Sequence, residues 1–511
     1  MNNTIINKSK QQEIMNNKNS GYPPTYKNNS KIISKTRKRK HKMSKKVTKN
    51  NNIEQIWGLG AEHEFVIKMN MNNIDEYIKL LETIYKVKVD KKFRLKLLSV
   101  IKKYKFENIN LVLPYVNHFK YDFVNMEITP NGVPMYEIKN LDYYNTNIIK
   151  IMSQLDEQKT KILASIKKEF KTNYNIDVNI DECDTGAGYL VHNKCSESNY
   201  VAIQDMNRII CTDYKNIKIQ DDTTGSYHFW ITLPHKKSDS STNIDKVHQK
   251  AILLLQTLEP LFVSIYGSCD PRINKSASNK HKTYLKGSYR GGTNAWAFYG
   301  TSNPINYNKY SLKSRVVNSI TIPNTKIGVT KFYNDIKNKI KSGINASNYI
   351  NYPVFSNYKW GDPVFGSDFR RKTNVKGFEF RIWDHFPQKN LPDVLKIVYL
   401  VATHAFNIKD DHLELPISLE SWNTAMRDTL LEGYTTKLKK NYSSFISKQL
   451  KIKLDHCKEP EMMLNNIISI LYKKVKKNNN SKYWLLTGEN IKNSKKPKIT
   501  NINKISQLIT K

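Results

Sequence analysis

Charged residues alternate with apolar ones in three short segments, and this alternation constrains the fold more than any other feature. The segments Gly60–Phe65, Tyr227–Trp230 and Phe378–Ile382 read GAEHEF, YHFW and FEFRI. A period of two residues is typical of β-strands, in which residues i and i+2 point to the same face of a sheet. The pattern therefore predicts strands that carry charged groups within otherwise apolar runs.

The charged groups of these strands have the chemistry of a magnesium–phosphate site. Glu62 and Glu64 share one face of the first strand, His228 lies in the second, and Glu379 and Arg381 share one face of the third. Magnesium prefers oxygen ligands, and the planar guanidinium of arginine suits a phosphate. Taken singly, each motif also fits a solvent-facing strand edge, an exposed ion pair or a structural histidine.

Further charged residues are candidates for the same site. Glu127 and Glu137 flank an Asn-Gly turn, each directly after a large apolar residue, and either one can complete a metal shell. Arg370 and Arg371 stand just upstream of the third strand, which favours a phosphate-facing cluster. The sequence leaves the choice between Glu127 and Glu137 open.

The charge of the chain is concentrated at its ends. The formal net charge is +38 over 511 residues, of which about +13 falls in residues 1–53 and about +10 in residues 473–511. Residues 1–53 contain few large apolar groups, so we expect them to be disordered. Their basic run 35–42 fits a nuclear-import signal, a nucleic-acid contact or a solvated tail. Such ends favour nonspecific contact with polyanions.

Cysteines and hydropathy indicate a soluble intracellular protein. The chain has five cysteines and no CxxC pair, which fits a reducing compartment better than a disulfide framework. Cysteines and a histidine within residues 183–211 match no standard zinc spacing. The longest apolar stretch, 251–266, is too short and too interrupted to span a membrane. We expect a cytoplasmic location, with the nucleus as the alternative that run 35–42 suggests.

The order of the expected elements predicts an α+β fold, in which helices pack on one face of an antiparallel sheet. We expect strands near 57–68, 123–128, 134–138, 186–191, 225–233 and 376–384. We expect helices at 144–170, 245–266, 391–408 and within 415–475. The expected regions are a disordered basic tail at 1–53, a catalytic domain at 54–412 with a helical insertion at 72–106, a helical region at 413–475, and a basic tail at 476–511.

Taken in order, these motifs resemble the carboxylate–amine ligases of the glutamine synthetase-like fold. The most similar group is the amidoligases, which are related to the glutamate–cysteine ligases. The family pattern has an E-x-E strand, an acidic second strand, a strand histidine, and an E-x-R strand followed by a helix. Here it falls on Glu62 and Glu64, on Glu127 or Glu137, on His228, and on Glu379 and Arg381. The family often has a second histidine where this chain has Trp230.

The resemblance implies an ATP- and Mg²⁺-dependent ligase that forms an amide bond through an acyl phosphate. It implies that the acidic residues and the histidine bind magnesium, and that Arg381, with Arg370 and Arg371, contacts phosphate. The substrates would be a carboxylate and an amine of unidentified structure. A glycine-rich loop with Arg290 and Asn294 either closes over the substrate or simply connects two elements.

Two other functions remain open at this level. The basic ends also fit a nucleic-acid-associated binding protein whose fold is not catalytic. The same superfold also supports phosphotransfer to a guanidino group, and fold alone does not separate this reaction from amide formation.

Overall fold

The computed structural model describes the part of the chain on which the fold rests. The described residues are 55–70, 74–86, 88–92, 94–95, 110–112, 125–128, 134–140, 142–183, 225–239, 245–268, 286–288, 369–371, 375–409, 413–414 and 420–509. All of them belong to one unit, Ile53–Lys511. The expected disordered tail and its basic run 35–42 therefore lie outside the described residues.

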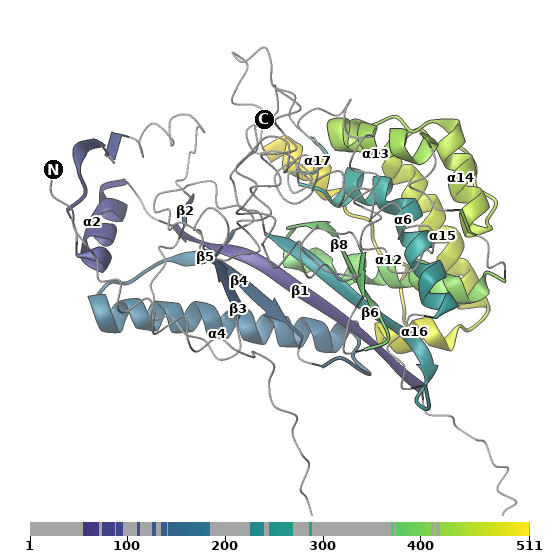
Figure 1. Ribbon diagram of the computed structural model, residues 1–511, viewed down its shortest axis with the longest axis horizontal. Coiled ribbons are helices and arrows are strands. Elements are labelled where there is room, and N and C mark those ends of the chain that lie inside the picture. Colours follow the sequence, from purple (N-terminus) through teal and green to yellow (C-terminus); the bar gives the residue numbers. More distant parts are fainter. Residues whose placement is uncertain are drawn as a thin grey trace, which may run out of the picture. The chain divides into compact units, whose positions relative to one another are not determined.

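An antiparallel sheet is the centre of this unit (Figure 1). Its strands are β1 (Gln55–Asn70), β2 (Asn110–Val112), β3 (Asn125–Ile128), β4 (Pro134–Lys139), β5 (Ile180–Cys183), β6 (Ser226–Lys236), β7 (Phe369–Arg371) and β8 (Phe378–Asp384). The order across the sheet is β3-β4-β1-β6-β8-β7, and β2 and β5 pair with the far end of β1. The long strand β1 thus joins the two parts of the sheet.

Helices follow and separate the strands in sequence. They are α2 (Ile74–Tyr85), α4 (Ile148–Tyr174), α6 (Lys246–Tyr266), α12 (Leu391–His404), α13 (Glu420–Glu432), α14 (Lys440–Leu450), α15 (Pro460–Lys477), α16 (Ser481–Thr487) and α17 (Ile502–Ile509). The mixture of helices with an antiparallel sheet confirms the α+β class. No helix among the described residues combines the length and the apolar character that a membrane crossing needs.

The period-two pattern predicted the strands of the central sheet well. Strands β1, β6 and β8 contain the three alternating segments, and β3 and β4 form the expected hairpin arms. The helices expected at 144–170, 245–266 and 391–408 correspond to α4, α6 and α12. Helix α2 occupies the first half of the expected helical insertion. The strand expected at 186–191 lies outside the described residues.

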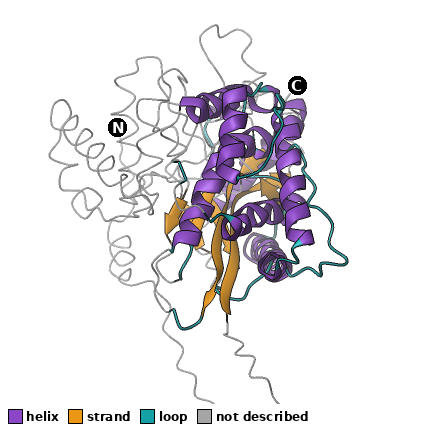
Figure 2. Ribbon diagram, turned by 90° about the vertical axis from the view of Figure 1, so that its right-hand side faces the viewer, coloured by secondary structure: helices purple, strands orange, loops and turns teal. Residues whose placement is uncertain are grey.

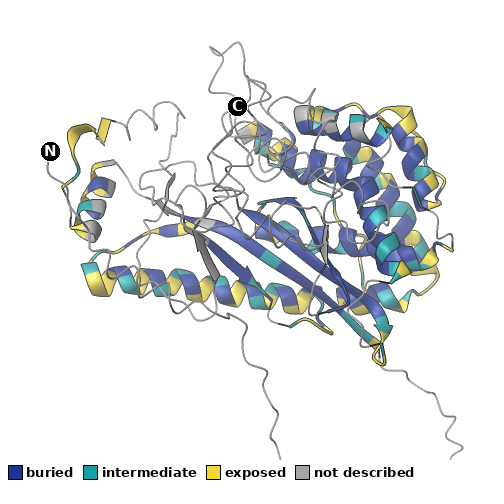
Figure 3. Cartoon of the chain, in the orientation of Figure 1, coloured by how far each residue is buried: buried dark blue, intermediate teal, exposed yellow. Residues whose placement is uncertain are grey.

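Apolar side chains on one face of the sheet form the core with α4, α6 and α12. Figure 2 shows the helices and the strands of this unit in different colours. In α4, buried residues recur at helical spacing, as Ile151, Leu155 and Ile162 show. Phe262 of α6 packs against Trp383 of β8, with ring centroids 5.0 Å apart. Burial of each such side chain contributes roughly 1.5–3 kcal/mol. Dark blue strands and helix α6 in Figure 3 trace this core.

Helix α6 is attached to the sheet by its first turn. The carboxylate of Asp245 accepts hydrogen bonds from the backbone N–H groups of Val247 and His248, both at 3.0 Å. It also lies 2.7 Å from Nδ1 of His248. Nε2 of the same imidazole accepts a hydrogen bond from the backbone N–H of Leu233 in β6. One side chain pair therefore caps the helix and fixes it against the strand.

The C-terminal end differs from the basic tail that we expected at 476–511. It contains α16 and α17, and Tyr483, Leu486 and Ile502 are buried in the core. The amide of Asn503 donates hydrogen bonds to the backbone carbonyls of Gly267 and Gly287. A few apolar residues are enough to hold these short helices, because they pack against the other helices of the core. The many lysines of this segment made its apolar pattern hard to recognise in the sequence.

Candidate functional site

The strand register brings the predicted charged residues together on the face of the sheet opposite the core helices. Glu62 of β1 pairs with His228 of β6, and Glu64 pairs with Ser226 of β6 on one side and Glu137 of β4 on the other. Glu379 of β8 pairs with Trp230 of β6. Cross-strand partners point to the same face, so four adjacent strands contribute to one site.

His228 lies at the centre of this arrangement and is fully buried. Its Nδ1 lies 3.1 Å from Oε1 of Glu62 and 3.8 Å from Oε1 of Glu379. Its Nε2 lies 3.5 Å from Oε2 of Glu64 and 3.2 Å from the hydroxyl of Ser226. The imidazole therefore contacts three carboxylates that come from two different strands.

A register shift accompanies this position. The pairing of β6 with β8 is regular from Ile231 to Phe229 and shifts before Tyr227, so that His228 falls at the irregularity. Such interruptions re-aim a side chain and are frequent beside functional sites. The shift therefore provides a local reason why His228 reaches carboxylates on both neighbouring strands.

Glu379 and Arg381 form the second part of the site. Glu379 is buried, and its Oε1 lies 3.2 Å from a guanidinium nitrogen of Arg381. The side chain of Arg381 remains one-fifth exposed, and a planar guanidinium is suited to an anionic ligand. In β7, Arg370 is in register with Glu379, whereas Arg371 is in register with Phe378 of the apolar face. The register thus favours Arg370 over Arg371 as a neighbour of the site.

Glu137 and Lys139 extend the site onto β4. Glu137 is buried, and its carboxylate accepts a hydrogen bond from the ammonium of Lys139 at 2.8 Å. Burial, and next the charge of Glu62, raise the pKa of Glu137 to about 8, although Lys139 opposes this shift. Burial alone would lower the pKa of Lys139, but the nearby Glu137 carboxylate raises it overall. Glu137 therefore keeps its proton to a higher pH than a free glutamate does.

Register also separates the two glutamates between which the sequence left a choice. Glu137 of β4 lies directly opposite Glu64 of β1. Glu127 lies on β3, which is separated from β1 by β4, and it pairs with Met135. Glu137 is therefore the better placed to join the carboxylates of β1.

Arg290 and Asn294, predicted to form a substrate loop, lie outside the described residues, as does most of the cysteine-containing segment 183–211.

Two residues of the site were not predicted from the sequence, and a third was noted only as a departure from the family pattern. The hydroxyl of Ser226 donates a hydrogen bond to Glu64, Lys139 pairs with Glu137, and the indole of Trp230 lies across Gly60 of β1. A Cβ atom on Gly60 would come 1.6 Å from that ring. The signal for Ser226 and Lys139 was present, because each lies two residues from a predicted site residue in the same strand.

The donor set fits a hard divalent cation. One ligand atom from each of Glu62, Glu64 and His228 can be chosen so that all lie within 4.8 Å of one another. Two carboxylates with a buried carboxylate nearby match the preference of Mg²⁺ for oxygen, and the imidazole is a donor that Mn²⁺ also accepts. Several buried acidic groups this close together repel one another, and a bound cation relieves that repulsion.

His63, between the two glutamates in sequence, does not belong to this face. Its imidazole stacks on Tyr227 with ring centroids 4.2 Å apart, on the side of the core. Burial, and then the nearby His385 and Lys159, hold the pKa of His63 well below its usual value. It is thus a neutral imidazole on the opposite side of the sheet from Glu62 and Glu64.

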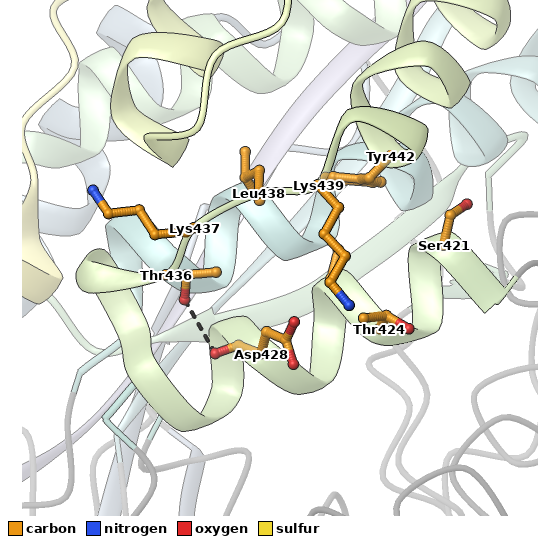
Figure 4. A pocket seen from close by; sticks show the side chains of 9 residues that line it. Ser421, Thr424, Asp428, Thr436, Lys437, Leu438, Lys439 and Tyr442 are labelled. Atoms are coloured by element: carbon orange, nitrogen blue, oxygen red, sulfur yellow. Dashed lines mark hydrogen bonds between the residues drawn. The ribbon is translucent and has the colours of Figure 1, made fainter.

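A separate pocket lies between α13 and the segment that leads into α14 (Figure 4). Its lining comprises Ser421, Thr424, Ala425, Asp428, Thr436, Lys437, Leu438, Lys439 and Tyr442. The hydroxyl of Thr436 donates to the backbone carbonyl of Asp428, and the ammonium of Lys437 pairs with Glu459 at 3.0 Å. None of the predicted site residues lines it, so the pocket is distinct from the carboxylate cluster.

Comparison with known proteins identifies no family. No family model matches the chain. The uncharacterized protein R704 of Acanthamoeba polyphaga mimivirus is 26% identical over 303 residues, which cover 57% of this chain and 47% of that protein. The chain thus spans about half the length of this relative. This likeness names no activity.

Proposed function

We propose that the chain is an ATP- and Mg²⁺-dependent carboxylate–amine ligase with a glutamine synthetase-like fold, similar to the amidoligases. The observation that carries the proposal is the meeting of His228 with carboxylates of β1 and β8, beside Arg381, on one face of an antiparallel sheet. The order of the motifs in the sequence and the pairing of their strands in space agree. Each supports the same nucleotide site.

The residues have separable roles in this proposal. Glu62, Glu64, Glu379 and His228 would hold magnesium, with Glu137 beside them, and the ion would neutralise phosphate charge and fix the geometry of ATP. Arg381 would bind the transferred phosphoryl group, with Glu379 orienting its guanidinium at 3.2 Å. A substrate carboxylate would attack the γ-phosphate and release ADP. An amine would then displace inorganic phosphate from the acyl phosphate and leave an amide.

Burial supports an electrostatic contribution from these residues. Glu379, Glu64 and His228 are all buried, and fixed charges in a site of low dielectric constant act on developing charge more strongly than they would in water. The side chain of Arg381 is held by a buried carboxylate, so little reorganisation would accompany binding of a phosphoryl group. Both features are expected of a site for phosphoryl transfer.

Calorimetric titration of the full chain with ATP in the presence of Mg²⁺ tests the nucleotide site. We expect binding that requires Mg²⁺ and that is lost in Glu62→Gln and in Glu379→Gln. Glu157→Gln is the matched control, because Glu157 lies exposed on α4 and pairs with Lys161. Circular dichroism establishes that each variant is folded. Absence of binding in the folded wild type, or equal binding in all variants, would contradict the proposal.

Product analysis distinguishes the reaction from a phosphotransfer on the same fold. With a panel of amines and carboxylates, a ligase yields an amide, ADP and inorganic phosphate in equal amounts. A guanidino kinase instead yields ADP and a phosphorylated acceptor without release of phosphate. Detection of the phosphorylated acceptor in a reaction that depends on Arg381 would keep the nucleotide site and replace the proposed reaction.

A further inference from the structure

A second group of potential metal ligands lies on the core side of the sheet. It consists of His63 from β1, Glu182 from β5 and His385, which directly follows β8. One ligand atom from each of the three lies within 4.8 Å of the others. Glu182 is in register with Ile67, which shares its face with His63, and helix α4 lies beside both strands (Figure 1). Three segments distant in sequence thus bring two imidazoles and a carboxylate together.

The surroundings of His63 point to a missing ligand. Its side chain is completely buried, and neither ring nitrogen has a hydrogen-bond partner among the residues that the structure describes. The imidazole contacts other rings instead: its centroid lies 4.2 Å from that of Tyr227, on which it stacks, and 5.0 Å from that of His385. A buried imidazole with no partner is costly and rare in native proteins, and an absent ion is one of its ordinary explanations.

We propose that His63, Glu182 and His385 form a binding site for Zn²⁺ between the sheet and α4. Two histidines and one carboxylate are a ligand set that zinc uses, with a fourth position left for water or another group. Each ligand atom would lie about 2 Å from the ion, so their mutual separations would be up to roughly 4 Å. Small side-chain movements therefore bring the observed atoms into range. The imidazoles favour a transition metal over Mg²⁺.

Lys159 of α4 competes with the metal for one of these ligands. Its ammonium lies 2.6 Å from Oε2 of Glu182, and both side chains are mostly buried. Binding of a dication requires that this ammonium move away or share the carboxylate. The competition distinguishes a metal site from a structural network, because removal of Lys159 favours the metal in the first case and removes a stabilising partner in the second.

Cobalt is a suitable probe, because Co²⁺ replaces zinc and absorbs visible light when it is coordinated. The full chain would be stripped with a chelator and titrated with Co²⁺ in the wild type, Glu182→Gln and His385→Asn. We expect one equivalent of visible absorption in the wild type, its loss in both variants, and its displacement by added Zn²⁺. No absorption in the wild type, or unchanged affinity in both folded variants, would overturn the proposal.

Further variants separate this site from the carboxylate cluster on the other face. The Glu62→Gln/Glu64→Gln double variant should keep the absorption, because its substitutions leave His63, Glu182 and His385 in place. If the absorption instead disappears with these two glutamates, the cobalt occupies the carboxylate cluster and the proposed site is refuted. Failure of the proposed ligase activity would leave the cobalt result unaffected, since the two sites share no ligand.

Substitution of the competing lysine provides the sharpest test. Lys159→Met should tighten Co²⁺ binding by about tenfold, since the ion no longer displaces a charge-assisted hydrogen bond. Lys161→Met is the matched control on the same helix, because Lys161 pairs with Glu157 on the exposed surface, and it should leave the affinity unchanged. Weaker or unchanged Co²⁺ binding in Lys159→Met would show that the cluster is a structural network.

Discussion

Glu64 and Glu137 lie directly opposite each other on β1 and β4, and both are buried. Two carboxylates in this relation repel each other unless one holds a proton or a cation lies nearby. Lys139 offsets part of the repulsion through its ammonium, which lies 2.8 Å from Glu137. A proton on Glu137 relieves the rest of the repulsion, and a bound dication would relieve it in the same way.

This relation predicts how stability depends on pH. The pKa of Glu137 rises from about 4.5 in the unfolded chain to about 8 in the folded one, so the folded protein holds a proton that the unfolded chain has lost. The resulting stabilisation is complete below pH 4.5 and disappears as the pH rises through 8. Glu137→Gln keeps the shape without the ionisation. Its stability relative to the wild type should therefore increase from pH 5 to pH 9.

Urea denaturation at pH 5, 7 and 9, with a chelator present, measures this difference. The exposed Glu157→Gln serves as control, and its stability relative to the wild type should show no comparable increase with pH. A difference between Glu137→Gln and the wild type that is constant across this range would mean that Glu137 is ionised in the folded protein throughout.

Removal of the Arg381 guanidinium beside Glu379 should destabilise the protein. Arg381 lies 3.2 Å from Glu379, whose side chain is only 1% exposed. Arg381→Met removes this partner from a buried charge, at an expected cost of about 3–5 kcal/mol in the free energy of unfolding. Adding Glu379→Gln should recover much of the loss, because the buried charge is then gone.

A double-mutant cycle in urea denaturation isolates the coupling between these two residues. Arg94→Met is the matched control, since Arg94 pairs with Asp75 at the surface, and its cost should stay below about 1 kcal/mol. Equal costs for Arg381→Met and Arg94→Met would indicate that Glu379 does not depend on Arg381 for its burial.

The sequence predicted which residues face the site more reliably than it predicted their neighbours. Period-two alternation identified Glu62 with Glu64 and Glu379 with Arg381, because residue spacing within one strand fixes the face. Pairing between strands depends on contacts across long stretches of chain, so no local pattern showed that Glu137 rather than Glu127 lies opposite Glu64. Register is set by the whole sheet, and a shift of one residue would reverse every face.

The same limit explains the core-facing histidine and the C-terminal helices. His63 lies between Glu62 and Glu64, so it points to the other face of the strand. Its approach to Glu182 and His385 depends on β5 and on the chain after β8. Helix α17 has a short apolar pattern that Asn503 and Lys504 interrupt. Its position is determined by the surface against which it packs, which the sequence of the segment does not contain.

Close contact between Gly60 and Trp230 predicts a strong steric effect. A Cβ atom at position 60 would lie 1.6 Å from the indole, which is 3% exposed and has little room to move. Gly60→Ala should therefore destabilise the protein by about 1–3 kcal/mol, the usual range for overpacking. Trp230→Leu should make the same glycine substitution nearly harmless. Thermal unfolding of the wild type, the two single variants and the double variant would measure this. If the losses of stability in the single variants simply add in the double variant, the contact is contradicted.

Asp245 should stabilise the protein both as a helix cap and as a partner of His248. Burial alone would raise its pKa, but the hydrogen bonds that its carboxylate accepts from the side chain and the backbone of His248 hold the pKa of Asp245 well below its usual value. The stabilisation is therefore present above the unfolded pKa of 3.8 and is lost as the pH falls through the lower folded value.

Asp245→Ala should cost about 1–2 kcal/mol at pH 7 through loss of the cap. Asp245→Asn keeps a capping oxygen and should cost less, with a weaker loss of stability in acid. Urea denaturation at pH 7 and pH 3 separates the two contributions, and equal costs for both variants at both pH values would mean that the charge of the Asp245 carboxylate adds nothing to its role as a cap.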